Sequence, residues 1–330
     1  MTRITWVDNA KAIAIYLVVL GHFHYSYAPL PFKGVIYAFH IPAFLFITGF
    51  LLPESFRGMA PGRFLSRYIG LYLRAYVFFS AIAIAIWWAA ECAGARGIVS
   101  PWPAIAGALY GISGQGGGLV HHDAPLWYFP FLVTAMLAAY LVTRVPAALG
   151  AILLVLYAAL GFLYSGPRLP WDLELGGIGG SFILAGHLFR RHLHPRLAPR
   201  LGAGANWILV PVLLAALVWL ARANGQVNIN GAEFGDNPIL FYLAALTGIA
   251  LLVLVSALLP ASRLATRISL DTLTIFALHI YLVMVFARLP HPETGWAATL
   301  GAILSAGVVT LLCLGLARVL KPALDRFVTR

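Results

Sequence analysis

Residues 6–26 read WVDNAKAIAIYLVVLGHFHYS, an apolar run with an acid and a lysine near its start and two histidines near its end. Such a run is long enough to cross the hydrocarbon layer of a membrane as a helix, which takes about 20 residues. Ionisable side chains in a membrane helix cost free energy and are functional candidates by default. The stretch therefore predicts a spanning helix with a site on it, built from Asp8, Lys11 and His22.

The composition of the whole chain supports this prediction. Hydrophobic residues make up 61% of the 330 and charged residues only 10%, whereas soluble domains carry about 25% charged residues. We expect an all-α, polytopic integral membrane protein with about ten transmembrane helices, forming a single domain over residues 1–330 without an appended soluble domain. The predicted spans are 10–27, 34–52, 66–90, 126–143, 146–164, 175–190, 206–222, 238–260, 271–288 and 295–318.

The distribution of basic residues predicts the orientation of the chain. With a cytoplasmic N-terminus, 16 of the 22 Lys and Arg residues fall on the cytoplasmic side, 5 fall outside and one, Arg74, falls within a span. This positive-inside bias places both termini in the cytoplasm. The formal net charge of +11 follows from this topology and from contact with membrane lipid, so it does not indicate a nucleic-acid partner.

The charged residues of the first helix lie at two ends of one face. Lys11 and His22 are separated by about three turns plus 20°, and Asp8 joins their face within about 40°. At about 1.5 Å per residue they lie roughly 16 Å apart, which excludes a catalytic pair and suits a long ligand lying along the helix. The alternative is that Lys11 extends to the inner interface and His22 caps the outer end.

Other ionisable residues fall within later spans. His40 precedes Pro42, which predicts a kink that brings the imidazole into the bundle, while a satisfied structural histidine is the alternative. His279 is a second mid-span imidazole. Arg67 and Arg74 are two turns apart on nearly one face, and an arginine inside a bilayer requires an anion, either a cytoplasmic ligand or a lipid head group.

No metal site is expected. His121, His122 and Asp123 are consecutive, and three adjacent loop residues seldom converge on one ion. Cys92 and Cys313 have no metal-binding or redox spacing.

These motifs resemble those of the integral-membrane acyltransferase family 3, most closely its fucose 4-O-acetylase-like branch. That family opens with an acid, then a Lys or Arg, and a histidine after ten further residues, as Asp8, Lys11 and His22 do here. The third helix departs from the family pattern, because Ala75-Tyr76 stands where a Pro-Tyr follows a tight basic pair. Further similar stretches are FHIPAFLFITGF (39–50), APLWYF (124–129), NINGAEFGDNP (228–238) and ISLDTLTIFALH (268–279).

The resemblance implies acyl transfer across a membrane. Such proteins take an acyl group, commonly acetyl or succinyl, from cytoplasmic acyl-CoA and place it on a hydroxyl group of a glycan. His22 would act as a base or form an acyl-imidazole first. The other expected site residues are Asp8, Lys11, His40, Trp127 and His279 in support, with Lys11, Arg67 and Arg74 binding the donor.

The resemblance also implies the partners and the location. We expect acyl-CoA, first of all acetyl-CoA, as donor substrate, a glycan or glycolipid as acceptor, and no metal. The expected location is the bacterial plasma (inner) membrane. Many family members carry an esterase-like domain outside the membrane, so a separate extracytoplasmic partner or a homo-oligomer stays open for this chain.

Two other classes of function would account for part of this pattern. A transporter or flippase for a small polar or glycolipid substrate would also use intramembrane His and Arg residues and Pro-broken helices. A non-enzymatic assembly subunit would not need the face shared by Lys11 and His22.

Overall fold

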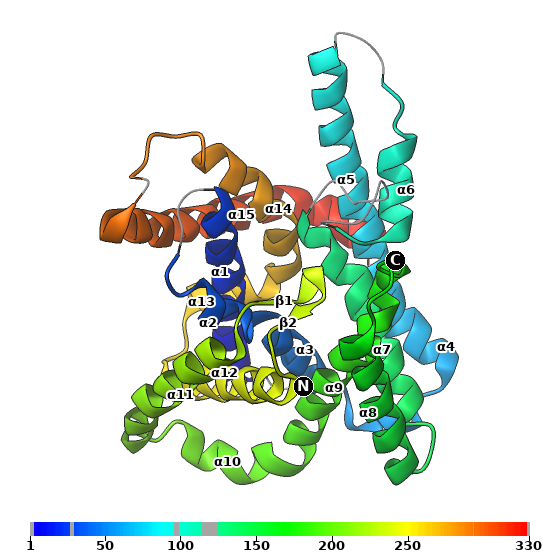
Figure 1. The fold of residues 1–330 in the computed structure, drawn as a ribbon, viewed down its shortest axis with the longest axis vertical. Helices are drawn as coiled ribbons and strands as arrows, with labels where there is room; N and C mark the ends of the chain where they lie inside the picture. Colours follow the sequence, from blue (N-terminus) through cyan, green and yellow to red (C-terminus); the bar gives the residue numbers. More distant parts are fainter. Residues whose placement is uncertain (1–2, 27–29, 96–98, 114–123, 293, 329–330) are drawn as a thin grey trace. The chain divides into compact units, whose positions relative to one another are not determined.

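The chain folds almost entirely into helices in the computed structural model, which describes residues 3–26, 30–95, 99–113, 124–292 and 294–328 (Figure 1). Helices satisfy their own backbone hydrogen bonds, as a chain in hydrocarbon must. The only strands in these ranges are a short antiparallel pair, β1 (Val227–Asn228) and β2 (Glu233–Phe234). The predicted all-α class is thereby confirmed.

Six helical segments in the described ranges are long and apolar enough to cross a membrane, and a bent pair of helices brings the number to seven. Three predicted spans have no counterpart in this group. The first helix is 22 residues long but carries Asp8 and Lys11, and two others have only 17 and 13 residues. Several membrane spans are thus supported, while the count of ten stays a prediction.

The first of two compact units comprises residues 1–51, 185–229 and 233–319. Its first helix, α1, packs against α3, α12, α13 and α14 (Figure 1). Ile15, Val19 and Phe23 of α1 are fully buried in this packing. The helices of this unit are α1 (Thr5–Ser26), α2 (Lys33–Tyr37), α3 (His40–Leu51), the π-helical turn η5 (Phe189–Leu193), α10 (His194–Leu201), η6 (Gly204–Ile208), α11 (Leu209–Asn224), α12 (Pro238–Leu258), α13 (Arg263–Leu270), α14 (Thr272–Phe286) and most of α15 (Gly295–Val328).

The second unit comprises residues 52–184, 230–232 and 320–330. Helix α7 is buried along most of its length and packs against α5, α8 and η4. The Phe64 and Tyr140 rings stack at 4.0 Å between their centroids. The helices of this second unit are η1 (Glu54–Gly58), α4 (Pro61–Phe64), the π-helical turn η2 (Leu65–Ile69), α5 (Gly70–Ala95), α6 (Trp102–Tyr110), η3 (Ala124–Trp127), α7 (Tyr128–Val142), α8 (Ala147–Leu163), η4 (Pro170–Leu175) and most of α9 (Gly176–Leu188). The residues of the turn η7 (Ile229–Gly231) are divided between the two units.

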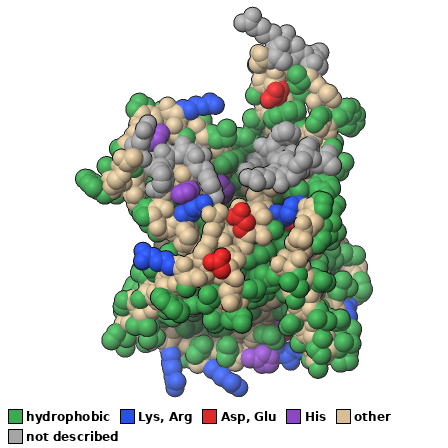
Figure 2. Space-filling model, in the orientation of Figure 1, with side chains coloured by type: hydrophobic (Ala, Val, Ile, Leu, Met, Phe, Trp, Pro, Cys, Tyr) green, Lys and Arg blue, Asp and Glu red, His purple; other side chains and the backbone are tan. Residues whose placement is uncertain are grey.

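Large apolar side chains are exposed along many helices. Leu163 of α8 is 78% exposed, and Val212 and Trp219 of α11 are 62% and 65% exposed. Hydrophobic side chains cover most of the face seen in Figure 2, where charged side chains are few. Apolar surface on this scale is what contact with lipid requires.

Candidate functional site

A pair of histidines from two helices lies near the C-terminal end of α1. His279 Nε2 of α14 is 3.1 Å from His22 Nδ1 of α1, and the ring centroids are 4.8 Å apart. His279 is fully buried. The structure therefore brings together two histidines that the sequence predicted on separate helices.

Backbone carbonyl groups decide which ring nitrogens carry protons. His279 Nδ1 lies 2.8 Å from the Phe276 oxygen and 3.1 Å from the Ile275 oxygen, so it must be the donor and Nε2 the acceptor. His22 Nδ1 faces that acceptor and the Val18 oxygen at 2.9 Å, so it carries a proton as well. We assign the remaining lone pair of the neutral His22 ring to Nε2, the atom a general base would use.

His40 is held close to the same end of α1. It begins α3 and is 7% exposed, and its Nδ1 lies 2.9 Å from the Ile36 carbonyl oxygen. The Tyr37 ring lies 4.9 Å from the His40 ring, and a Cβ on Gly21 would come within 3.0 Å of Tyr37. The break in this span falls at residues 38–39, just before His40 and ahead of Pro42.

The N-terminal end of α1 carries a second polar group. Asp8 accepts hydrogen bonds from Arg3 Nε and from Ser269 Oγ, the latter at 2.7 Å. Lys11 Nζ donates to the carbonyl oxygen of Ser269. Asp8 lies in the first turn of α1 and pairs with Arg3. These residues line a cavity of about 450 Å³.

One broken helix reaches both ends of α1. Helices α13 and α14 meet at an angle of 84°. Ser269 lies before the bend and contacts Lys11, whereas His279 lies after it and contacts His22. Because α1 is one continuous helix, its two polar ends stay roughly 16 Å apart. Nothing in the sequence relates Ser269 to Lys11, so this contact was missed.

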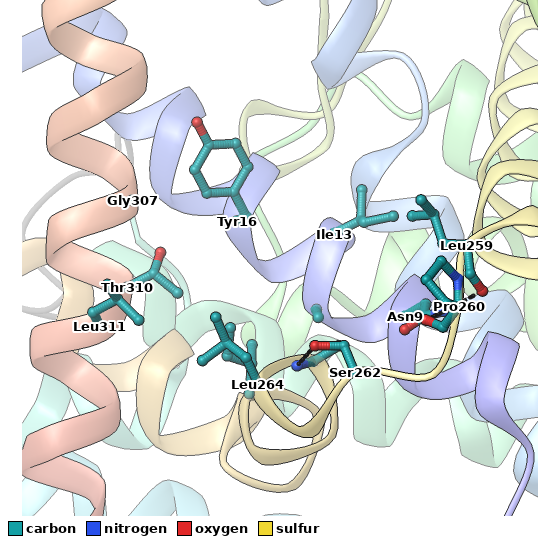
Figure 3. A pocket seen from close by; sticks show the side chains of 13 residues that line it. Asn9, Ile13, Tyr16, Leu259, Pro260, Ser262, Leu264, Gly307, Thr310 and Leu311 are labelled. Atoms are coloured by element: carbon teal, nitrogen blue, oxygen red, sulfur yellow. Dashed lines mark hydrogen bonds between the residues drawn. The ribbon is translucent and has the colours of Figure 1, made fainter.

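A different face of α1 borders an apolar cavity of about 480 Å³, shown in Figure 3. Ile13 and Tyr16 line it from α1, and Leu264 and Leu311 face it from α13 and α15. Asn9 Nδ2 closes one end by donating to backbone oxygens of the loop after α12. The described residues that line it include no charged side chain, so this cavity supplies no cation to pair with a phosphate.

The predicted donor-binding arginines Arg67 and Arg74 belong to the second unit. Arg67 lies within the π-helical turn η2, 5.8 Å above the Tyr68 ring. Arg74 Nε donates to the Val328 oxygen at 2.8 Å. Anion binding by either residue stays a prediction.

Trp127 also belongs to the second unit. It is 6% exposed and stacks on Phe131 with ring centroids 5.5 Å apart. This packing is sufficient to explain a buried tryptophan at the start of α7, and its role in the active site stays a prediction.

A buried ionic cluster in the second unit was not anticipated. Arg168 contacts both Asp172 and Glu174, the latter at 2.6 Å. Trp171 and Asp172 have positive φ angles of 60° and 53°, a conformation that costs non-glycine residues free energy. Burial raises the pKa of Asp172 to about 7, although Arg168 acts in the opposite direction. The signal that could have predicted this cluster is the close spacing of one arginine and two acids in PRLPWDLE (167–174).

No group of three or more His, Cys, Asp or Glu side chains within the described ranges is placed to hold a metal ion. The stretch His121, His122 and Asp123 lies outside the residues that the structure describes.

The fold and the site define a helical membrane protein. The His22–His279 pair lies at one end of α1, and a cation cluster that includes Arg3 and Lys11 lies at the other. Comparison with protein families finds a match to an acyltransferase domain over residues 4–318. The chain therefore belongs to the membrane acyltransferase family 3. No curated protein and no solved structure matches it.

Proposed function

We propose that this protein is an acyl-CoA-dependent O-acyltransferase that transfers an acetyl group, or another acyl group such as succinyl, to a hydroxyl group of a cell-surface glycan or its lipid-linked precursor. Family membership supports the reaction class and favours it over the transporter alternative. The observation that carries the role of His22 is its hydrogen bonding to His279 and Val18, which leaves Nε2 as the basic nitrogen.

In this reaction, His22 Nε2 accepts the proton of the acceptor hydroxyl group while the hydroxyl oxygen attacks the thioester carbonyl carbon. A C–O bond forms and gives a tetrahedral intermediate. Collapse of the intermediate breaks the C–S bond, and the imidazolium gives its proton to the departing thiolate. Such general-base catalysis typically accelerates a reaction about 10²–10⁴-fold. An acyl-imidazole route would use the same nitrogen as nucleophile.

The remaining assignments follow from the two ends of α1. Lys11 would hold the phosphate end of the donor at the predicted cytoplasmic side, and the pantetheine arm would extend along α1 towards His22. His40 and His279 would shape the acyl-transfer end, while Asp8 would hold the helix start that positions Lys11. Arg67, Arg74 and Trp127 are further candidates for donor and active-site contacts, and the proposed location is the bacterial inner membrane.

Acyl transfer by the reconstituted protein tests the role of His22. With labelled acetyl-CoA and glycan-bearing membrane extract, His22→Ala is expected to lower transfer by about 10² or more, because the base is lost. His192→Ala, an exposed histidine in η5, is the matched control and should transfer normally. A folded His22→Ala protein with the wild-type rate would contradict the proposal.

A further inference from the structure

The cavity at the N-terminal end of α1 is also lined by an arginine from a later helical turn. Arg190 lines this cavity together with Arg3, Lys11 and Asp8. Three cations and one acid leave an excess of two positive charges. Because Asp8 is paired with Arg3, the excess is carried by Lys11 and Arg190.

The local fold explains why Arg190 reaches a cavity built on α1. Helix α9 ends at Leu188, and the chain continues through the π-helical turn η5 (Phe189–Leu193) that contains Arg190. Turns of this kind are uncommon and frequently occur at functional sites. Arg190 Nη1 donates to the Phe50 oxygen at 2.9 Å, and the guanidinium lies 5.6 Å above the Phe50 ring. These contacts hold the guanidinium beside the end of α3.

The cavity has two further features that favour an anion. Ile4 and Val7, at the start of α1, also line it, and the N-terminus of a helix attracts negative charge through its exposed backbone N–H groups. An arginine can bind a phosphate through two parallel N–H donors, whereas a lysine binds it as a point charge. Lys11 and Arg190 thus offer complementary contacts to a ligand with more than one phosphate.

We propose that Arg190 acts with Lys11 to bind the phosphate groups of the coenzyme A moiety of the donor in this cavity. This assignment rests on the proposed function, because it takes acyl-CoA as the donor. It explains why the cation cluster lies at the end of α1 opposite to His22. Arg190 is a binding residue in this proposal and takes no part in the transfer of the acyl group.

Coenzyme A binding to the full-length, detergent-purified protein tests the proposal by calorimetry. Arg190→Gln is expected to raise the Kd for coenzyme A about tenfold or more, since it removes charge-assisted hydrogen bonds. Arg190→Lys keeps the positive charge but loses the two parallel N–H donors of the guanidinium. Its Kd should lie between those of the wild type and Arg190→Gln. Arg191→Gln is the matched control, because Arg191 is the exposed neighbour in the same turn, and its Kd should stay at the wild-type value.

Acyl-transfer kinetics complete the test. For Arg190→Gln, the KM for acyl-CoA should rise with the Kd, while kcat at saturating donor and the KM for the acceptor stay unchanged. Equal Kd values in Arg190→Gln and Arg191→Gln, both folded by circular dichroism, would overturn the inference and leave the proposed function standing if the wild type still transfers acyl groups. Arg190-dependent coenzyme A binding without acyl transfer to any glycan would instead defeat the proposed function. A wild type that binds no coenzyme A would overturn both.

The same cations could bind the phosphate of an anionic lipid. Coenzyme A titrations are therefore repeated in nanodiscs of phosphatidylcholine alone and with phosphatidylglycerol added. Arg190-dependent binding in phosphatidylcholine alone supports the nucleotide moiety as the ligand. If the Arg190→Gln effect is absent in phosphatidylcholine and appears only with phosphatidylglycerol, the site belongs to lipid and the inference is wrong.

Discussion

His22 and His279 are both held by carbonyl oxygens of their own helices, and neither ring contacts a carboxylate within the described residues. A carboxylate partner would bring a charge into the membrane, which costs free energy. A neutral imidazole can accept a hydrogen bond from the His22 Nδ1–H group without that cost. In the proposed reaction His279 would be a positioning residue, because it would act on the acceptor hydroxyl group only through His22.

Replacing His279 separates this positioning role from simple packing. His279→Phe removes one of the two acceptors that face His22 Nδ1 and leaves only the Val18 oxygen. The tautomer with a basic Nε2 is then less well supported, and kcat/KM should fall about tenfold or more. His279→Gln offers an amide oxygen near the position of Nε2 and should recover part of the rate. The measurement is the pH profile of acyl transfer for both variants, with His192→Ala as control. If His279→Phe and His279→Gln lower kcat/KM equally, His279 serves only for packing.

The arrangement that spacing predicted for the first helix is a local one. The common face of Asp8, Lys11 and His22 follows from helix geometry, so spacing was enough to predict it. The partners of that face come from residues 269 and 279, more than 250 positions later. Only the tertiary packing of α13 and α14 against α1 brings them together, and no spacing rule contains that information.

At the scale of helices, close approach depends on small residues. Gly186 near the end of α9 faces α3, where an added Cβ would lie 1.9 Å from the Phe46 carbonyl oxygen. Contacts of this kind are typical of membrane proteins, since packing, rather than the hydrophobic effect, holds their helices together. Gly186 stands four residues before Arg190, so this contact also positions the turn that carries the cation.

Gly186→Ala should therefore destabilise the protein by about 1–3 kcal/mol, the usual cost of forcing extra volume into a packed site. The measurement is the midpoint of thermal unfolding in detergent, together with coenzyme A affinity. Gly315→Ala is the matched control, because a Cβ there meets nothing within 4 Å and alanine favours the helix. If both variants unfold at the wild-type temperature, the contact between α9 and α3 is looser than the structure shows.

Element boundaries were partly predictable. Apolar runs gave the positions of most long helices, but α13 (Arg263–Leu270) was not predicted because its basic residues interrupt the hydrophobic pattern. The π-helical turns around Arg67 and Arg190 were also missed. A π-helical turn arises from one displaced hydrogen bond and has no distinct composition, so hydropathy cannot report it.

For the whole molecule, composition decided the class and left the number of spans open. A chain with 61% hydrophobic residues must expose apolar surface to lipid, and the exposed leucines of α8 do so. The number of spans is difficult to predict where a helix is polar or short. The charged residues and histidines of α1 lower its hydropathy, and α9 has only 13 residues before the turn η5. The candidate site residues thus make α1 harder to recognise as a span from its hydropathy.

Thiol labelling of intact cells would test both the orientation and the shortest predicted span. Positions 165 and 198 flank the predicted span 175–190, and the positive-inside rule places Ser165 outside and Ala198, among the arginines of α10, inside. With Cys92 and Cys313 replaced by alanine, Ser165→Cys should react with an impermeant reagent, and Ala198→Cys should react only after permeabilisation. Reversed labelling would invert the predicted topology. Labelling of both positions from one side would show that residues 175–190 do not cross the membrane, and the count of ten would be wrong.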